Sequence, residues 1–502
     1  MSRRPLVIFA TLVVVVSPVP LAREAAAAPL YAVPATVRVN IALLGTSYAV
    51  LSSTGTVTVT GAGGSVVYTG GLRTVARTNV RRLAEGGGID LPPTNTNATD
   101  LTPEERQSRA LLFREARQAS REEPRALVTV PFQLTVLQND RDDVGKQLIA
   151  SDRVVGLHLV TDDGFLTFNG RAFRGTFDIA LDDENDMIIV NEVATSEYLA
   201  SVVGSEEPTS WEPEALAAQA IAARTYLVTH LAKHGAYDLE GDTRDQAYDG
   251  VGSEAPSTVK AVQRTAGIVA TYGGRAIEAL YSANAGGITE DSENVYASAL
   301  PYLRSVPSPA DEVASASSWG HTSWQWTREF TAPQLREYLS VRGINVGDVQ
   351  RIDITQTSKT GRVIGARVVG SAGSRDIGKD RSRYYFGLLS TLFTVAVHDA
   401  DETEFVSYTN SDRLRTLQLL GATIDAPAYS RTVNSDRETA EIRVVGWIYR
   451  LPGRFVFTGK GFGHGVGMSQ WGAQGMALRG SSASEILTHY YLGIALTNIG
   501  GA

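Results

Sequence analysis

Two short segments far apart in the chain carry the residue types that could do chemistry. The first, at 203–208, contains two consecutive glutamates followed by a proline. The second, at 459–477, is rich in glycine and carries His464 near its centre. A carboxyl group beside apolar structure, together with a backbone almost free of side chains, predicts a site that holds an extended polymer next to an acid.

The carboxyl group of Glu206 is the candidate acid. An apolar run at 199–203, which has the pattern of a strand, precedes it, and a helix is predicted to follow. Burial disfavours ionisation and raises a carboxyl pKa from about 4.3 towards 6, the range of a general acid. The alternative is that Glu206 and Glu207 are exposed loop carboxylates, and that Glu207 interacts favourably with the dipole of the following helix.

The predicted helix begins near Pro213, because proline is favoured at the first helical position. A narrow stripe of small and apolar residues follows at helical spacing: Leu216, Ala220, Ala223 and Leu227. Such small side chains predict that this helix packs closely against another element.

The glycine loop, residues 459–467, has glycine at every second position. In an extended segment this alternation leaves one face bare, so that the backbone can approach a ligand. The spacing fits neither a dinucleotide fingerprint nor a phosphate-binding loop. The alternative is a structural bend in which His464 bonds to backbone groups.

Several side chains in and after this loop are suited to binding sugars. His464 lies between Gly463 and Gly465, and the hydrogen-bonding residues Ser469 and Gln470 follow shortly afterwards. A ring next to hydrogen-bonding side chains is a familiar arrangement for carbohydrates.

The composition excludes several classes of function. The chain has 502 residues, a net charge of −8 and no cysteine. Nucleic acid is therefore an unsuitable partner, and disulfides, thiolate catalysis and thiolate-bound zinc are excluded. Neither a nucleophile elbow nor a H-E-x-x-H motif is present, which argues against a hydrolase with a serine nucleophile and against a metalloprotease.

The first 28 residues have the pattern of a secretory signal. Arg3 and Arg4 precede an apolar stretch at 6–16, and small residues at 25–28 offer a cleavage site. We therefore expect the protein to act outside the cytoplasm. The alternative is an uncleaved segment that anchors the protein in the membrane.

The length predicts two or three domains and the mixed patterns predict an α+β fold. Strand patterns dominate the first part, helices are predicted at about 332–341 and 484–491, and an Asn-Gly turn is predicted at 169–170. The expected order is a signal peptide (1–28), a β-rich region (29–84), a linker with a helix at 103–121 (85–125), the first part of the main domain (126–398), an insertion (399–440) and the second part of the main domain (441–502).

Many ordered motifs resemble those of the SpoIID/LytB family, which contains a sporulation protein with peptidoglycan lytic transglycosylase activity and an amidase enhancer. The resemblance runs from about residue 165 to 493, interrupted by the insertion. The matching motifs are S-E-E-P at 205–208, E-A-L-A-A-Q-A-I-A-A-R-T-Y at 214–226, Y-S-A-N-A-G-G-I-T-E at 281–290, G-L-L-S-T-L-F at 387–393, G-K-G-F-G-H-G-V-G-M-S-Q-W-G-A at 459–473 and E-I-L-T-H-Y-Y at 485–491.

This resemblance implies an α+β core of mixed strands with a packed helix after the acidic motif. It also implies cleavage of the glycan strands of peptidoglycan, with Glu206 as the single general acid and base and a 1,6-anhydro-N-acetylmuramic acid end as product. No cofactor is expected. The alternatives are a wall-binding modifier that enhances a peptidoglycan amidase and, more weakly, a structural envelope protein.

The resemblance also indicates which residues accompany the acid. Those expected to bind the glycan are His464, Gln470, Ser469, Tyr281, Ser282, Gly463 and Gly465, and those expected to support the acid are Gln219, Arg224 and Glu207. The expected partners are peptidoglycan glycan strands and another cell-wall hydrolase.

Two departures from the family pattern stand out. Glu207 replaces the usual methionine and places a second carboxyl beside the acid. Some relatives bind zinc through Cys, His and Cys in the segment that corresponds to 238–248. This chain has Glu240, Arg244 and Asp245 there, and because arginine cannot ligate a metal, no zinc is expected.

Overall fold

The computed structural model confirms the α+β class. The structure describes residues 32–42, 48–61, 65–78, 132–136, 146–151, 157–181, 187–318, 320–398, 403–407, 423–426, 433–435, 438–440, 446–450 and 453–500. The predicted signal peptide and the predicted linker with its helix lie outside these described residues. In the part of the chain that the structure describes, no helix combines the length and apolar character needed to span a bilayer.

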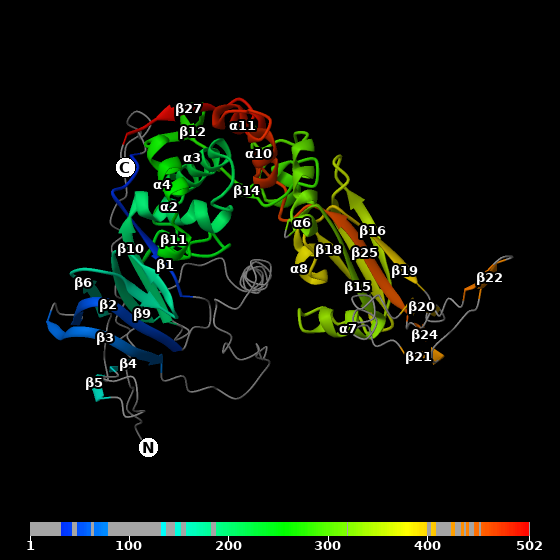
Figure 1. The fold of residues 1–502 in the computed structure, drawn as a ribbon, viewed down its shortest axis with the longest axis horizontal. Helices are drawn as coiled ribbons and strands as arrows, with labels where there is room; N and C mark the ends of the chain where they lie inside the picture. Colours follow the sequence, from blue (N-terminus) through cyan, green and yellow to red (C-terminus); the bar gives the residue numbers. More distant parts are fainter. Residues whose placement is uncertain are drawn as a thin grey trace, which may run out of the picture.

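The largest sheet among the described residues has eleven strands and lies at the lower left of Figure 1. Its strands are β1 (Thr36–Asn40), β2 (Tyr48–Gly61), β3 (Val66–Thr78), β4 (Phe132–Val136), β5 (Lys146–Ser151), β6 (Leu157–Thr161), β7 (Leu166–Phe168), β8 (Arg171–Phe173), β9 (Thr176–Leu181), β10 (Met187–Ala194) and β11 (Leu239–Glu240). Because β1 pairs with both β10 and β11, strands from the predicted β-rich region share one sheet with strands of the predicted main domain.

The predicted Asn-Gly turn is confirmed between β7 and β8. Asn169 and Gly170 both have positive φ angles, 48° and 80°, as a two-residue hairpin turn of this kind requires. The turn also attaches the hairpin to β2, because the Asn169 side chain accepts a hydrogen bond from the Val50 N–H.

The apolar run at 199–203 is helical, so its interpretation as a strand was wrong. It belongs to α2 (Thr195–Glu206), which ends at the candidate acid. Tyr198, Leu199, Val202 and Val203 are buried and recur at the spacing of one helix face. A short apolar run does not distinguish a buried strand from a buried helix. Here the run is helical, and its apolar side chains pack in the core of the large sheet.

The predicted helix after the acidic motif is confirmed as α3 (Pro213–Thr229), with proline in its first turn. Its burial is wider than the predicted stripe. Leu216 and Ala220 pack with the core of the large sheet, whereas Ala217, Ala218 and Ile221 pack on the other side against the C-terminal helices. The helix is therefore buried nearly all round, which explains why so many of its residues are alanines.

Further helices and short strands lie in the same region as α3 (Figure 1). They are η2 (Gly250–Ser253), α4 (Pro256–Arg264), β12 (Ile268–Tyr272), β13 (Arg275–Ala276), β14 (Tyr281–Ser282), α5 (Ser292–Val295), β26 (Met468–Ser469), α10 (Gln470–Ala477), α11 (Ala483–Tyr490) and β27 (Ala495–Asn498). The predicted terminal helix is thereby confirmed as α11.

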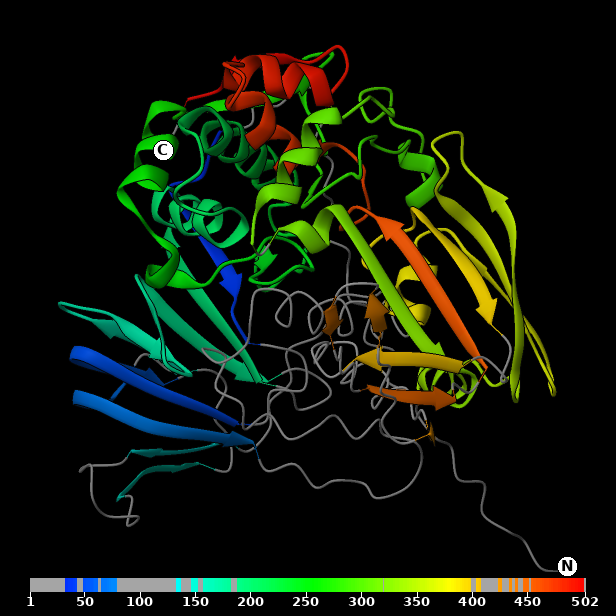
Figure 2. The same cartoon turned by 45° about the vertical axis from the view of Figure 1, so that its right-hand side comes forward.

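A second body with its own core lies at the right of Figure 1. It contains α6 (His321–Trp324), β15 (Gln325–Thr331), α7 (Ala332–Ser340), β16 (Val349–Thr357), β17 (Val363–Gly370), β18 (Gly373–Gly378), α8 (Arg381–Phe386), β19 (Phe393–His398) and β25 (Arg454–Lys460). The helix η3 (Pro309–Ala316), which precedes α6 in the chain, packs mainly against α10. The helix predicted at about 332–341 is confirmed as α7, which begins with a capping box formed by Thr331 and Gln334. In Figure 2 the large sheet lies at the lower left, the helices lie above it, and this second body lies at the right.

The segment predicted as an insertion is described only in part. The strands seen there and just beyond it are β20 (Thr403–Ser407), β21 (Thr423–Ala426), β22 (Val433–Ser435), β23 (Glu438–Ala440) and β24 (Gly446–Arg450), and β24 pairs with both β20 and β21.

The glycine loop is not extended, which corrects the prediction for this segment. After β25, Gly461, Gly463, Gly465 and Gly467 all have positive φ angles, between 74° and 108°. The loop therefore folds tightly against the segment 280–286 of the same chain. For example, a Cβ at Gly463 would come within 2.6 Å of the Ser282 Cβ. At these positions the missing side chains allow the chain to approach itself.

We expect Gly467→Ala to destabilise the protein more than Gly235→Ala. Both glycines have nearly the same φ, 75° and 71°, so each substitution costs about 1–2 kcal/mol for the left-handed backbone. A Cβ at Gly467 would also lie 2.0 Å from the Leu280 carbonyl oxygen, whereas nothing lies within 4 Å at Gly235. Urea unfolding should show about 1–3 kcal/mol of additional loss for Gly467→Ala, and equal losses would contradict this packing.

Candidate active site

The carboxyl group of Glu206 lies at the C-terminal end of α2 and is half-buried. Its Oε1 accepts a hydrogen bond from the backbone N–H of Ala247 at 2.8 Å and a longer one from the Tyr281 hydroxyl at 3.5 Å. Its Oε2 accepts a hydrogen bond from the side-chain amide of Gln470 at 3.2 Å. Three separate segments of the chain therefore hold one carboxyl group.

The pairing of two short strands brings these segments together. β14 and β26 run parallel, with Tyr281 opposite Met468 and Ser282 opposite Ser469. Gln470 follows immediately as the first residue of α10. Two predicted glycan-binding residues, Tyr281 and Gln470, thus reach the candidate acid from positions 75 and 264 residues away in the chain.

The environment of Glu206 favours its protonated form. Burial raises the pKa of this carboxyl above its ordinary value, and the charge of Asp249 adds to the effect. The hydrogen bonds from Ala247, Gln470 and Tyr281 act in the opposite direction, because they stabilise the carboxylate, but they offset only part of the rise in pKa. A carboxyl with this balance can donate a proton at a pH where an exposed glutamate is ionised.

The side chain of Glu207 is more deeply buried than that of Glu206. Only 2 % of it is exposed, and neither carboxylate oxygen has a hydrogen-bond partner. Burial, and then the charge of Glu206, raise the pKa of Glu207 well above its ordinary value. The alternative of an exposed loop carboxylate is therefore wrong for Glu207.

The structure places His464 within the folded glycine loop. Its Nδ1 accepts a hydrogen bond from the Val466 N–H at 3.0 Å, and its ring meets the edge of the Tyr296 ring at a centroid distance of 5.7 Å. The neighbouring Gly463 packs on Ser282, whose hydroxyl is buried without a partner. Ser282 thus lies beside Tyr281 on β14, and His464 lies on the loop that packs against this strand.

Ser469 and Gly465 contact the protein's own interior. The Ser469 hydroxyl donates to the Asp311 carboxylate and accepts from the N–H groups of Ala285 and Gly472. Gly465 lies against the guanidinium of the buried Arg362. Both residues therefore fix the loop and the start of α10, and glycan contact by them remains a prediction.

The two residues predicted to support the acid from α3 differ in their surroundings. Arg224 is buried and donates to the backbone oxygens of Val262, Thr265 and Ile268, so it fastens α4 and β12 to α3. These hydrogen bonds go to backbone oxygens at and after the end of α4, and a supporting role of Arg224 at the acid stays a prediction. Gln219 is fully buried, and both of its side-chain amide atoms have no hydrogen-bond partner.

Sequence reasoning missed the groups of the segment 245–247. The Ala247 N–H makes the shortest hydrogen bond to Glu206, and the Gln246 side chain bonds to Tyr281. A backbone N–H leaves no signal in a sequence. For Gln246 the available signal was its place in the segment that corresponds to the zinc site of some relatives.

The residues at 240–245 do not fit a zinc ion. The Arg244 guanidinium lies 2.8 Å from the Glu240 carboxylate and 2.8 Å from that of Asp242. Asp245 accepts hydrogen bonds from Tyr226, Lys233, His234 and the Glu240 N–H. The carboxylates are thus already satisfied by cations and hydrogen-bond donors, and among the described residues no three acidic or histidine side chains are grouped to hold a metal.

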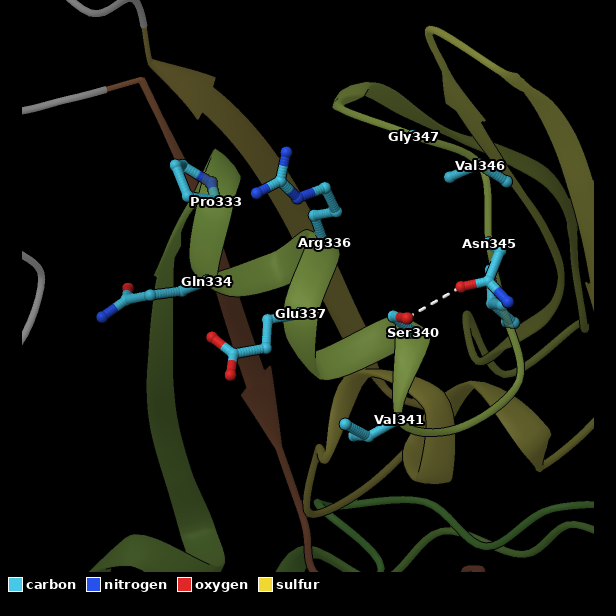
Figure 3. A pocket seen from close by; sticks show the side chains of 10 residues that line it. Pro333, Gln334, Arg336, Glu337, Ser340, Val341, Asn345, Val346 and Gly347 are labelled. Atoms are coloured by element: carbon cyan, nitrogen blue, oxygen red, sulfur yellow. Dashed lines mark hydrogen bonds between the residues drawn. The ribbon is translucent and has the colours of Figure 1, made fainter. Parts of the chain in front are cut away.

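A cavity of about 590 Å³ lies in the second body, away from these groups. It is lined by one face of α7 and by the loop that follows it, and Figure 3 shows Ser340 hydrogen-bonded to Asn345 at its edge. None of the predicted site residues lines this cavity.

We expect Glu207→Met to make the stability of the protein less dependent on pH. A carboxyl whose pKa is raised by folding stabilises the folded state fully below its unfolded pKa, near 4.3, and this contribution is lost as the pH rises through the folded pKa. The free energy of unfolding of Glu207→Met, relative to wild type, should therefore increase by up to about 1.4 kcal/mol per pH unit above pH 4.3.

The measurement is urea unfolding between pH 4 and 8. Glu337→Gln, which removes one carboxyl from the exposed face of α7, is the matched control for the loss of a charge at the surface. If the free energies of unfolding of Glu207→Met and wild type changed equally with pH, the burial of an unpaired carboxyl would be refuted.

Comparison with known proteins supports the motif resemblance. A family model described as "Stage II sporulation protein" matches residues 183–272, and one described as "Domain of unknown function" matches residues 309–410. The first match contains α2, α3 and the segment 240–247, and the second falls largely on the second body.

Three relatives are similar over most of the chain. An uncharacterized protein of Brachyspira hyodysenteriae is 28% identical, with 68% of this chain and 77% of the relative covered. The stage II sporulation protein D of Bacillus amyloliquefaciens is 30% identical, with 61% and 75% covered. The amidase enhancer of Bacillus subtilis is 31% identical, with 60% of this chain but 40% of the relative covered. On this similarity, and on the motifs that surround Glu206, the chain belongs to the SpoIID/LytB family.

Proposed function

We propose that this protein cleaves the glycan strands of peptidoglycan as a lytic transglycosylase, with Glu206 as its single general acid and base. The observation that supports this most directly is the half-buried Glu206 carboxyl, with its raised pKa, held by donors from three segments. Glu206 is also the residue onto which the family's S-E-x-P motif carries the catalytic acid.

The proposed reaction needs only this one carboxyl group. Protonated Glu206 donates its proton to the glycosidic oxygen as the bond to C1 of the N-acetylmuramic acid breaks. The 6-hydroxyl of the same sugar attacks C1, and the Glu206 carboxylate takes up the hydroxyl proton. The products are a 1,6-anhydro end and a free 4-hydroxyl on the neighbouring sugar. No water is consumed, and the acid returns to its starting state.

The Glu207 carboxyl has no assigned step in this reaction. It is buried without a hydrogen-bond partner, whereas a second carboxyl that activates a water would have to face the substrate. In the proposal the flanking residues His464, Ser282, Gln470 and Tyr281 bind the glycan near the acid.

A second candidate function is that of a non-catalytic modifier that enhances a peptidoglycan amidase. It is supported by the 31% identity to a protein named amidase enhancer. Under either function the partner is peptidoglycan, so the protein acts outside the cytoplasm. That location agrees with the signal pattern at 1–28.

The purified protein should release anhydromuropeptides, or anhydro-disaccharide ends from peptide-stripped glycan, when no other enzyme is added. Glu206→Gln should lower this rate by about 10²–10⁴-fold, because it removes the proton that is transferred. Mass spectrometry of the released fragments measures both results.

Glu197→Gln, at the first turn of the same helix, is the matched control and should retain activity. Products with reducing ends alone would indicate a hydrolase. No release alone, but faster release of stem peptides when a purified amidase is added, would support the enhancer instead.

A further inference from the structure

The side chain of Gln246 links the buried Tyr198 to the partly buried Tyr281 next to the candidate acid. Gln246 is fully buried, its Oε1 accepts from the Tyr198 hydroxyl at 3.0 Å, and its Nε2 donates to the Tyr281 hydroxyl oxygen at 2.9 Å. The same Nε2 lies 3.4 Å from the backbone oxygen of Ala223, which can only accept. This carbonyl fixes the orientation of the amide, because the reversed amide would place two acceptors face to face.

This orientation determines where the Tyr281 hydroxyl hydrogen points. The hydroxyl oxygen already accepts the N–H of Gln246, so its own hydrogen must be donated elsewhere, and Oε1 of Glu206 is the acceptor at 3.5 Å. Burial, and then the charge of Glu206, raise the pKa of Tyr281 well above its ordinary value, so the hydroxyl keeps its hydrogen.

The two oxygens of Glu206 are therefore unequal. Oε1 receives donors from both Ala247 and Tyr281, whereas Oε2 receives one, from Gln470. We infer that Gln246 is a positioning residue of the proposed reaction: it turns the Tyr281 hydroxyl towards Oε1 and so leaves Oε2 as the oxygen that carries the transferable proton. This inference rests on the proposed function.

The segment that carries Gln246 is held firmly enough for this role. The adjacent Asp245 has a fully buried side chain and accepts hydrogen bonds from Tyr226, His234 and the Glu240 N–H. The next residue in the other direction, Ala247, donates directly to Glu206. One anchored segment thus supplies both the backbone donor and the amide that orients the second donor.

The test measures the protonation of Glu206 directly. The titratable groups that face it are Tyr281 from β14, Tyr198 from α2, Asp249 from the turn before η2, and its neighbour Glu207. A ¹³C NMR titration of protein with labelled glutamate, with the Glu206 signal assigned through its loss in Glu206→Gln, follows the acid without any substrate.

Tyr281→Phe removes a donor to the carboxylate and should raise the midpoint of the Glu206 titration by about 0.5–1 pH unit. Gln246→Met, of similar size but without hydrogen bonds, should raise it in the same direction, because the hydroxyl hydrogen is no longer directed. The double variant should match Tyr281→Phe alone, since both changes act through one hydrogen bond. Gln334→Met, which removes the capping amide of α7, should leave the midpoint unchanged.

An unchanged midpoint in Gln246→Met, or additive shifts in the double variant, would overturn the inference. If Gln246→Met does not fold, Tyr198→Phe replaces it, and a smaller shift in the same direction is expected because the Gln246 amide loses one of its hydrogen bonds. In the activity assay, the alkaline limb of anhydro-product release should move with the NMR midpoint.

The two proposals can fail separately. If Glu206→Gln still releases anhydro ends, the proposed function is wrong whatever the titration shows. If Glu206→Gln is inactive but the titration does not respond to Gln246, the function stands and the positioning role is wrong.

Discussion

The parallel pairing of β14 with β26 is the contact on which the rest of the site depends. It joins two-residue strands from opposite ends of the last half of the chain, and it places Tyr281 and Gln470 on the same carboxyl group. The pairing is possible because the glycine loop folds back tightly beside residues 280–286, with reciprocal hydrogen bonds between Asn284 and Phe462. Side chains at Gly461, Gly463 and Gly467 would occupy the space of that neighbouring segment.

Burial of carboxyl groups is the second constraint. Desolvation raises the pKa values of both Glu206 and Glu207, but the two residues are treated differently by their surroundings. Glu206 receives three donors and is only partly buried, which suits its proposed role of giving up and regaining a proton. Glu207 receives no hydrogen bond and is enclosed, so its protonated form is favoured. Ionisation of this buried carboxyl lowers the stability of the folded protein.

The helices behind the acid form a rigid support. α3 is packed on both sides, by the core of the large sheet and by the core that contains α10 and α11, and its alanines allow both to approach closely. The segment 240–247 is fixed by ion pairs and hydrogen bonds around Arg244 and Asp245. Elements held in this way keep the Ala247 N–H and the Gln246 amide at the acid, as the proposed general-acid role requires.

Local chemistry in the sequence determined much of the fold. Proline at the start of α3, the capping box of α7 and the Asn-Gly turn after β7 each act within a few residues, so these elements could be predicted. The candidate acid, Tyr281 and Gln470 were also found, because their motifs carry the family resemblance. Tertiary structure alone decided that the run before Glu206 is a helix and that the glycine loop packs on its own chain. It also decided that Arg224 binds the backbone at the end of α4. It alone supplied the Ala247 N–H and the Gln246 amide, because contacts between segments depend on the whole fold and a backbone donor has no residue type to reveal it.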